Sequence, residues 1–227
     1  MTGMTFYGGK LSHHGQEVNA ISLSQALHSL DLFFGDDTVV LAAHNCRVFD
    51  ARVLVTAIRN SHSLFLLRKI VGFADTLPLA KQLLPNQKKY NQETLFHQII
   101  GENYAAHDAL EDVKALKKIV EKLAPSDDIL HQNSFSVNFV SDSLDHLKLK
   151  KENCDTLVPL TGVLSASMIQ KIAASGLNFK HLQIANTRDS ERGIYNIFTE
   201  KLPNNKLRVT SRKQIIDSVK SFLSGTD

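Results

Sequence analysis

Two residues whose types could do chemistry stand close together in the sequence, His107 and, five positions later, Asp112. Histidine titrates near neutral pH and can act as a general base, while a carboxylate can bind a divalent metal. If both residues were helical, they would diverge by roughly 140° around the helix axis. They can converge only if His107 lies in the loop before the helix and reaches back over its first turn. The alternative, since short patterns recur by chance, is a loop histidine and a solvated acid.

A helix must position Asp112, and the stretch from Tyr104 to Leu123 predicts one. Its apolar residues recur at offsets of three and four, which places them on one buried face. These residues are Ala109, Val113, Leu116, Ile119, Val120 and Leu123. The N-terminus of this helix would add positive potential for an anionic substrate.

A second group of candidate residues follows a predicted strand. Residues 38–43 (TVVLAA) form a β-branched and apolar run, as expected of a buried parallel strand. This strand delivers His44 and Asn45 at its carboxyl end, where open α/β sheets place their chemistry. A helix over 47–60 is predicted next, with Asp50 in its first turn as either a helix-dipole acid or a site carboxylate. Its expected inward residues are Phe49, Val53, Leu54, Ala57 and Ile58.

The other elements of this region alternate in the same way. Strand, helix, strand, helix is the pattern of a parallel sheet with covering helices, so the predicted fold class is α/β. The expected elements are a strand at 70–73 and helices at 22–35, 77–84 and 92–100. A short strand, a Gly-Gly turn and a second extended piece are expected over 4–10 and 16–21.

Composition excludes several classes of protein. The chain has 227 residues, 43% of them hydrophobic, and a net charge of +3, which excludes bulk disorder and a polycation that coats nucleic acid indiscriminately. Cys46 and Cys154 lie far apart without metal-ligand spacing, which indicates free thiols in an intracellular protein, nuclear or cytoplasmic. No apolar run approaches twenty residues and no signal-peptide pattern opens the chain, so we expect a soluble protein with no membrane partner.

Three segments stand in order between residues 22 and 123: AAHNCRVFD, GFADTLPLAKQLLP and YNQETLFHQIIGENYAAHDALEDVKAL. They resemble the second motif, the strand and helix after it, and the third motif of the DEDDh (DnaQ-like) 3′-5′ exonucleases, which have a ribonuclease H-like fold. The resemblance implies that Asp50 is the second-motif acid, His107 the general base and Asp112 the third-motif metal ligand. It also implies that single-stranded DNA or RNA 3′ ends are the substrate, with His44 and Asn45 as nucleic-acid contacts.

Hydrolysis assisted by two divalent ions explains these residue types. The ions, about 4 Å apart, clamp the scissile phosphate and require several carboxylates around one cleft. A histidine takes the proton of the attacking water. All-oxygen ligation suits Mg²⁺ or Mn²⁺, for which Asp112 and Asp50 are the expected ligands.

The chain departs from the family at its first motif. The family begins with a strand bearing Asp-x-Glu, and nothing before Thr38 reads D-x-E. A lone carboxylate holds magnesium weakly, so we expect slow hydrolysis or none. Without that strand, the edge of the strand at 38–43 would be left open to self-association. Either the sequence is a fragment, splice form or incomplete gene model of a longer exonuclease, which retention of the three site residues favours, or it is a degenerate domain kept for binding.

The remaining sequence predicts a boundary and a helical tail. We expect an exonuclease-like domain lacking the first-motif strand at 1–125, a linker and packing segment at 126–163, and a small helical domain at 164–227. The pattern SFSVNFV at 134–140 predicts a strand or an extended segment packed on the first domain. The segment from Lys180 to Lys220 contains nine Lys or Arg and four Asp or Glu. This surplus of positive charge indicates either an extension of a nucleic-acid track or a solvated helical face.

The order of an exonuclease-like domain and a helical tail also resembles the exonuclease-like C-terminal region of promyelocytic leukaemia protein and its fish relatives. Three functions compete at this stage. An active exonuclease would release 3′ nucleotides with a metal, and a catalytically inactive relative would bind single-stranded DNA or RNA without turnover. A protein-interaction module would do neither, with its function in the helical tail.

Overall fold

The computed structural model describes residues 3–225, which belong to two compact units divided between Ser141 and Asp142. Unit 1 precedes this division and is α/β, and unit 2 follows it and is helical. The fold class is therefore as predicted, whereas the three-part division of the chain stays a prediction. Within the described residues, no helix is long and apolar enough to cross a membrane.

The N-terminal strands form a small antiparallel meander of β1 (Met4–Tyr7), β2 (Lys10–His13) and β3 (Gln16–Glu17). Gly8 and Gly9 both have positive φ, the conformation that a tight hairpin turn requires. The predicted short strand and Gly-Gly turn are therefore present, whereas the second extended piece was expected only from Gln16, and the sequence prediction missed β2 directly after the turn.

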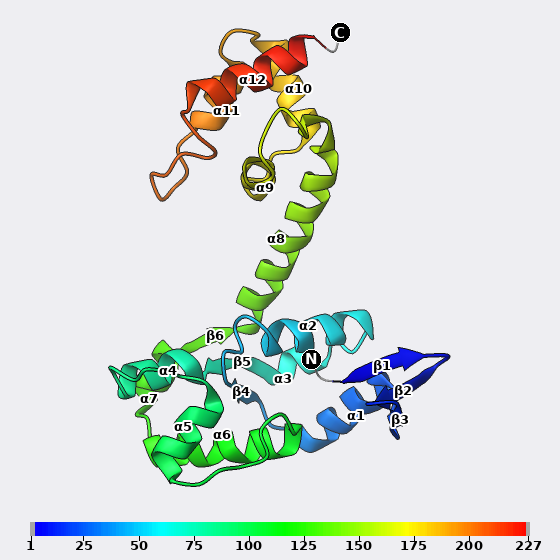
Figure 1. Ribbon diagram of the computed structural model, residues 1–227, viewed down its shortest axis with the longest axis vertical. Coiled ribbons are helices and arrows are strands. Elements are labelled where there is room, and N and C mark those ends of the chain that lie inside the picture. The colour runs from blue at the N-terminus through cyan, green and yellow to red at the C-terminus, as the bar shows by residue number, and fades with distance from the viewer. Residues whose placement is uncertain (1–2, 226–227) are drawn as a thin grey trace. The chain divides into compact units, whose positions relative to one another are not determined.

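The second sheet of unit 1 has the order β4-β5-β6 (Figure 1). β4 (Val39–Ala43) pairs in parallel with β5 (Ile70–Asp75), which pairs antiparallel with β6 (Ser134–Ser136). β4 is thus a terminal strand, and among the described residues its outer edge has no partner. This confirms the open strand edge that the sequence predicted.

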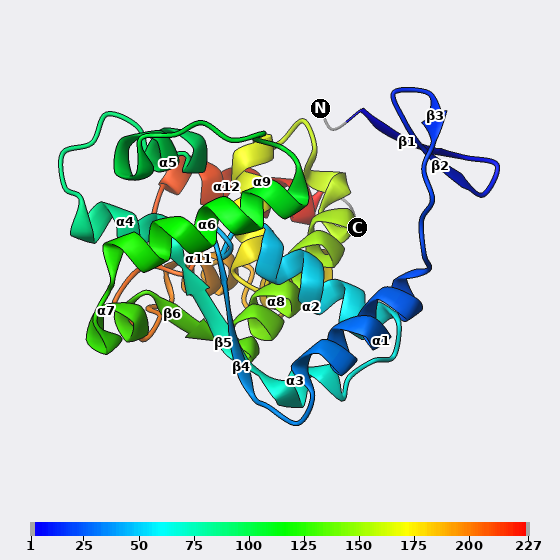
Figure 2. The same ribbon diagram turned by 90° about the horizontal axis from the view of Figure 1, so that it is seen from below.

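Helices connect and cover these strands (Figures 1 and 2). They are α1 (Leu23–Phe34), α2 (Asp50–Asn60), α3 (Leu66–Lys69), α4 (Thr76–Leu83), α5 (Gln92–Ile100), α6 (Ala109–Leu123) and α7 (Asp127–Gln132). The caps explain several bounds. Ser22 and Gln25 form a capping box at the start of α1, and Gly101 adopts the left-handed conformation that ends α5.

The buried face of α2 differs from the prediction. Phe49 is the residue before the helix and is 66% exposed, and Val53 is 52% exposed. The buried positions are Ala51, Val55 and Ile58, which follow one another at offsets of four and three. The prediction was therefore correct for Ile58 and wrong for Phe49 and Val53, and α2 begins at Asp50 rather than at Arg47.

The apolar stripe of α6 is only partly covered. Ala115 and Ile119 are buried and pack with Leu95 and Phe96 of α5, whereas Val113 is 66% exposed. The prediction that the whole stripe faces inward was therefore wrong. α5 covers one flank of α6, and its other flank lines a pocket that reaches Ala42 and Ala43 at the end of β4.

α8 (Val137–Thr156) is a single helix that contains the division between the units. It begins directly after β6, so the predicted strand at 134–140 was correct only as far as Ser136. Unit 2 continues with the 3₁₀ helix η1 (Val158–Leu160) and four α-helices: α9 (Ala166–Ala174), α10 (Phe179–Arg188), α11 (Gly193–Thr199) and α12 (Lys213–Ser224). Their core includes fully buried Leu157, Leu160, Ile172, Leu182, Phe198 and Val219.

Candidate functional site

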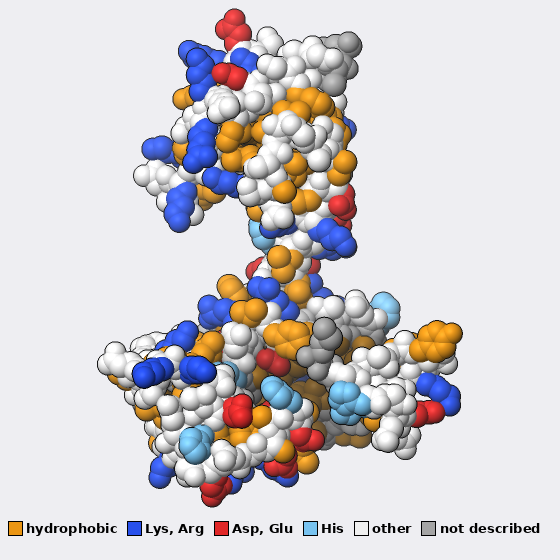
Figure 3. All heavy atoms as spheres, in the orientation of Figure 1, with side chains coloured by type: hydrophobic (Ala, Val, Ile, Leu, Met, Phe, Trp, Pro, Cys, Tyr) orange, Lys and Arg blue, Asp and Glu red, His pale blue; other side chains and the backbone are white. Residues whose placement is uncertain are grey.

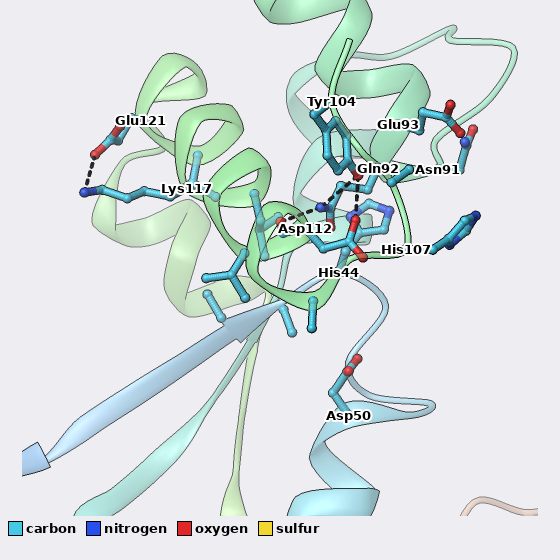
Figure 4. Close-up of a pocket in the computed structure, with 17 residues that line it drawn as sticks. His44, Asp50, Asn91, Gln92, Glu93, Tyr104, His107, Asp112, Lys117 and Glu121 are labelled. Atoms are coloured by element: carbon cyan, nitrogen blue, oxygen red, sulfur yellow. Dashed lines mark hydrogen bonds and ion pairs between the residues drawn. The ribbon is translucent and has the colours of Figure 1, made fainter. Parts of the chain in front are cut away.

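One pocket of unit 1 brings together most of the predicted site residues (Figure 4). It has a volume of about 730 Å³ and lies among the end of β4, the start of α2, the start of α5 and the length of α6. His44, Asp50, His107 and Asp112 all line it. Asn45 is not among the residues that line this pocket.

Asp112 lies in the first turn of α6, which Asp108 caps by accepting hydrogen bonds from the backbone N–H groups of Leu110 and Glu111. The Tyr104 hydroxyl donates to Asp112 Oδ1 over 2.9 Å. Gln92 Nε2 donates to the Asp112 backbone carbonyl over 2.7 Å. Burial, together with the hydrogen bond to Asp112, raises the pKa of Tyr104 to about 12. Tyr104 therefore remains a neutral donor that fixes the Asp112 carboxylate near neutral pH.

His107 lies in the loop before α6, as the sequence predicted, with a left-handed φ of 74°. This conformation is uncommon for residues other than glycine, although His adopts it more readily than most. The side chain is exposed, and in Figure 4 its ring points away from the Asp112 carboxylate. The predicted reach of His107 back over the first turn is thus absent from this conformation, and its role as a base stays a prediction.

Asp50 is the first residue of α2, where the helix dipole favours a negative charge. Figure 4 shows its carboxylate pointing from α2 toward the pocket, on a different element from Asp112. The side chain is exposed to solvent. Two acids far apart in the sequence therefore face one cavity, which the resemblance implied and the local pattern alone did not.

His44 has both ring nitrogens engaged within the protein. Nδ1 lies 3.0 Å from Thr76 Oγ1, and Nε2 lies 2.7 Å from the Tyr90 carbonyl oxygen. A carbonyl can only accept, so Nε2 carries the proton, and in the neutral ring Nδ1 is an acceptor that shares the Thr76 hydroxyl with the Ala43 carbonyl oxygen, 3.4 Å from Thr76 Oγ1. Burial lowers the pKa of His44, which keeps the ring neutral. His44 thus joins β4 to α4 and to the loop before α5, and its contact with nucleic acid stays a prediction.

The loop after β4 is held by Asp75, a buried carboxylate that sequence reasoning passed over. Asp75 Oδ1 accepts from the backbone N–H groups of Asn45 and Leu77, and Oδ2 accepts from that of Arg47. Asn45 has a left-handed φ of 62°, and its predicted contact with nucleic acid also stays a prediction. The signal for Asp75 was present in the sequence, since an Asp-Thr pair ends the apolar run at 70–73 where a helix N-cap belongs.

The carboxylates of the pocket fit a divalent ion poorly. Over the part of the chain that the structure describes, no three His, Cys, Asp or Glu residues are grouped so as to hold a metal. Asp112 already accepts a hydrogen bond from Tyr104, and Asp50 stands on another helix. Mg²⁺ bound by one or two protein carboxylates keeps most of its water ligands. As they stand, Asp50 and Asp112 form an incomplete ligand set.

Sequence reasoning also missed Tyr104 as a site residue. Its hydroxyl links Asp112 and Gln92, and all three residues line the pocket. Tyr104 precedes Asp112 by eight residues, and a partly buried tyrosine needs a partner for its hydroxyl. The identity of that partner depends on the loop geometry from Glu102 to Asp108, which no periodic pattern predicts.

Comparison with protein families places a different match on each part of the chain. Residues 12–120 match the family described as exonuclease, and residues 153–226 match the family described as PML, C-terminal domain. No curated protein and no solved structure gives a significant match. The first match supports the resemblance to the ribonuclease H-like exonucleases and a nuclease-type function with a nucleic-acid substrate. The second supports the resemblance to the C-terminal region of promyelocytic leukaemia protein that the order of the two regions indicated.

Proposed function

We propose that unit 1 is an exonuclease-type domain of an intracellular protein that binds the 3′ end of single-stranded DNA or RNA in the pocket between β4 and α6. The observation that carries the proposal is the convergence of Asp50, His107 and Asp112 on one cavity. Asp50 is more than fifty residues away in the sequence from the His107–Asp112 pair, and all three are the residues that the exonuclease resemblance assigns to the site. The family match over residues 12–120 supports the same class of function.

We further propose that hydrolysis by this chain is weak or absent. Clamping a phosphate between two divalent ions requires more carboxylates than Asp50 and Asp112 provide. Mg²⁺ or Mn²⁺ would be held by these two residues with low affinity, and His107 would have to rotate toward Asp112 to act as the base. The part of the reaction that the chain's own residues support best is binding of the strand end.

The direct test is release of nucleotides from a short, 5′-labelled single strand of DNA or RNA in the presence of Mn²⁺, Mg²⁺ or EDTA. We expect slow, metal-dependent shortening from the 3′ end, reduced at least about tenfold by Asp112→Asn. The amide oxygen of the introduced asparagine can still accept the Tyr104 hydrogen bond, so the substitution preserves the fold. Asp128→Asn, which changes an exposed residue of α7 outside the pocket, is the matched control.

The outcomes separate two functions. Equal activity of wild type and Asp112→Asn would show that any shortening comes from a contaminant. Binding of the strand in EDTA without shortening in any metal would identify the second candidate, a catalytically inactive module that binds nucleic acid. Failure to bind either nucleic acid would exclude both candidates.

We also propose that unit 1 self-associates through the outer edge of β4. The strand is apolar throughout, its outer edge has no partner among the described residues, and Val40 is 54% exposed. Natural edge strands are normally protected by a charge, a proline or a covering element. Antiparallel pairing of β4 with the same strand of a second copy would satisfy its free N–H and C=O groups.

A further inference from the structure

A second pocket lies in unit 2, and it combines apolar walls with cationic side chains. It has a volume of about 260 Å³ and is formed by residues of α10 and α11, by Leu177 just before α10 and by Arg208 in the segment between α11 and α12. Leu177, Ile184 and Ile197 provide apolar surface, and His181, Arg188 and Arg208 provide the polar groups. None of these residues belongs to the site in unit 1.

One face of α10 forms a wall of this pocket. His181, Ile184 and Arg188 are separated by three and four residues, so they lie in a row along the helix. Ile184 is 38% exposed, although a branched aliphatic side chain gains free energy when it is covered. The row thus presents an uncovered apolar residue between a histidine and an arginine.

Arg208 is held in place by the protein. Its Nε donates to the Ser175 carbonyl over 3.2 Å, and its Nη1 donates to Glu200 Oε2 over 2.6 Å. The backbone N–H of Arg208 donates to the Glu200 carbonyl, which fixes the chain at this point. A guanidinium that is already oriented loses little conformational entropy when a carboxylate binds to its remaining N–H groups.

Arg188 is the last residue of α10, and its charge is favoured there by the helix dipole. Within residues 3–225, no hydrogen bond or ion pair of the Arg188 guanidinium is found, whereas Arg208 shares its charge with Glu200. The pocket therefore has one free cation and one partly neutralised cation. Figure 3 shows apolar side chains exposed beside Lys and Arg side chains on the face of unit 2 that it draws.

We propose that this pocket binds a short acidic segment of a protein partner. One aliphatic or aromatic side chain of that segment would contact Ile184 and Ile197, and a neighbouring carboxylate would bind Arg188 and Arg208. The volume is below the ~300 Å³ that small-molecule sites usually reach, so it suits one inserted side chain better than a nucleotide. A phosphate track would require more cations than the one free and one partly neutralised arginine of this pocket. The proposal does not depend on the function proposed for unit 1.

The test uses the full chain and labelled synthetic peptides in a fluorescence anisotropy titration. The probe peptide has one leucine flanked by glutamates, and two matched peptides replace the leucine by serine or the glutamates by glutamine. We expect the probe to bind, and each matched peptide to bind at least about tenfold more weakly. Added salt should lower the affinity of the probe peptide more than it lowers any residual affinity of the glutamine peptide, because salt screens the attraction between charges.

Three variants locate the binding site. Arg188→Ala and Ile184→Ser should each raise the dissociation constant of the probe by about fivefold or more. Arg212→Ala, which removes an exposed arginine outside the pocket, should change it less than about twofold. Because Arg188 and Ile184 are both exposed, we expect each variant to remain folded. Circular dichroism during thermal unfolding checks this.

Several results would overturn the proposal. Equal binding of the probe and the serine peptide would show that the apolar pocket is not used. An equal effect of Arg188→Ala and Arg212→Ala would reduce the interaction to general charge attraction. Binding of single-stranded DNA but not of the probe, lost in Arg188→Ala, would assign the surface to nucleic acid instead.

Discussion

The two units differ in how completely they bury their own apolar residues. In unit 2, Leu182, Phe198 and Val219 are fully buried from different helices. In unit 1, Val40 of β4 and Val113 of α6 are 54% and 66% exposed. The helices of unit 2 therefore enclose a core of their own, although Val158 and Ile184 remain exposed on its surface, whereas in unit 1 apolar surface is exposed at the edge of the sheet and beside the candidate site.

This difference indicates where a partner would contribute free energy. Covering a half-exposed valine contributes up to about 1.5 kcal/mol, whereas a residue that is already buried contributes nothing further on association. Association should thus stabilise unit 1 around β4 and α6 and leave the interior of unit 2 unchanged.

The largest expected effect is in the core of unit 2. Phe198→Ala should lower the free energy of unfolding of that unit by about 3–5 kcal/mol, because it leaves a cavity among buried helices. Tyr195→Ala in the same helix is the control, since Tyr195 is 50% exposed, and should change it by about 0.5 kcal/mol or less. Hydrogen exchange in urea, measured separately on peptides of each unit, provides the readout. Equal effects of the two substitutions would contradict the closed core.

A smaller effect is expected at His44. His44→Gln should destabilise unit 1 by about 2 kcal/mol, because two hydrogen bonds of the ring are weakened or lost. The native pKa of His44 lies below its unfolded value of 6.5, so the stability it contributes is present above pH 6.5 and is lost as pH falls below that value.

The measurement is hydrogen exchange across β4 and β5 at two pH values, one on each side of 6.5. Wild type should lose more protection on acidification than His44→Gln does. Peptides of unit 2 serve as the internal control, because His44 lies in unit 1. A variant that loses as much protection as wild type on acidification would rule out His44 as the source of the pH response.

Much of the fold could be predicted from sequence because its signals are local. The β-branched run at 38–43 predicted β4. The helices expected at 22–35 and 92–100 are also present, with ends that Ser22 and Gly101 fix through hydrogen bonds and backbone conformation within a few residues. The open edge of β4 followed from the resemblance combined with the missing D-x-E pattern. These predictions required no knowledge of distant contacts.

The errors arose where tertiary packing decides. Nothing in the α6 sequence tells which flank of its apolar stripe α5 covers, so Val113 was expected inside. For the same reason, the hydrogen bond from Tyr104 to Asp112 was not predicted, nor were the three hydrogen bonds that the Asp75 carboxylate accepts from backbone N–H groups. The candidate acids were found by type and spacing, whereas the groups that hold them depend on loop geometry.

The open edge of unit 1 can be tested by placing a charge on it. Val40→Lys should raise the dissociation constant for self-association by about tenfold, because a lysine on an edge strand opposes pairing with another strand. Val158→Lys is the matched control in unit 2, since Val158 is 62% exposed and outside the sheet. Sedimentation at several protein concentrations measures both. A monomeric wild type, or equal effects of the two lysines, would exclude the β4 edge as the interface.

The smallest expected effect separates positioning of Asp112 from stability. Tyr104→Phe removes the hydrogen bond to Asp112 and should cost unit 1 about 1 kcal/mol. The native pKa of Tyr104 is raised from 10.0 to about 12, so its contribution is present below pH 10 and is lost as pH rises from 10 toward 12. Wild type should therefore lose more protection than the variant above pH 10.

The functional readout is binding of a single-stranded 3′ end with and without Mn²⁺. Removing the Tyr104 hydroxyl frees Asp112 Oδ1 but also lets the carboxylate rotate, because no other side-chain donor to it is found among the described residues. If Asp112 contacts the metal, Tyr104→Phe should change the Mn²⁺-dependent part of binding and leave binding in EDTA unchanged. A change confined to EDTA conditions would instead show that the Tyr104 hydroxyl acts on nucleic-acid binding and not on metal binding by Asp112.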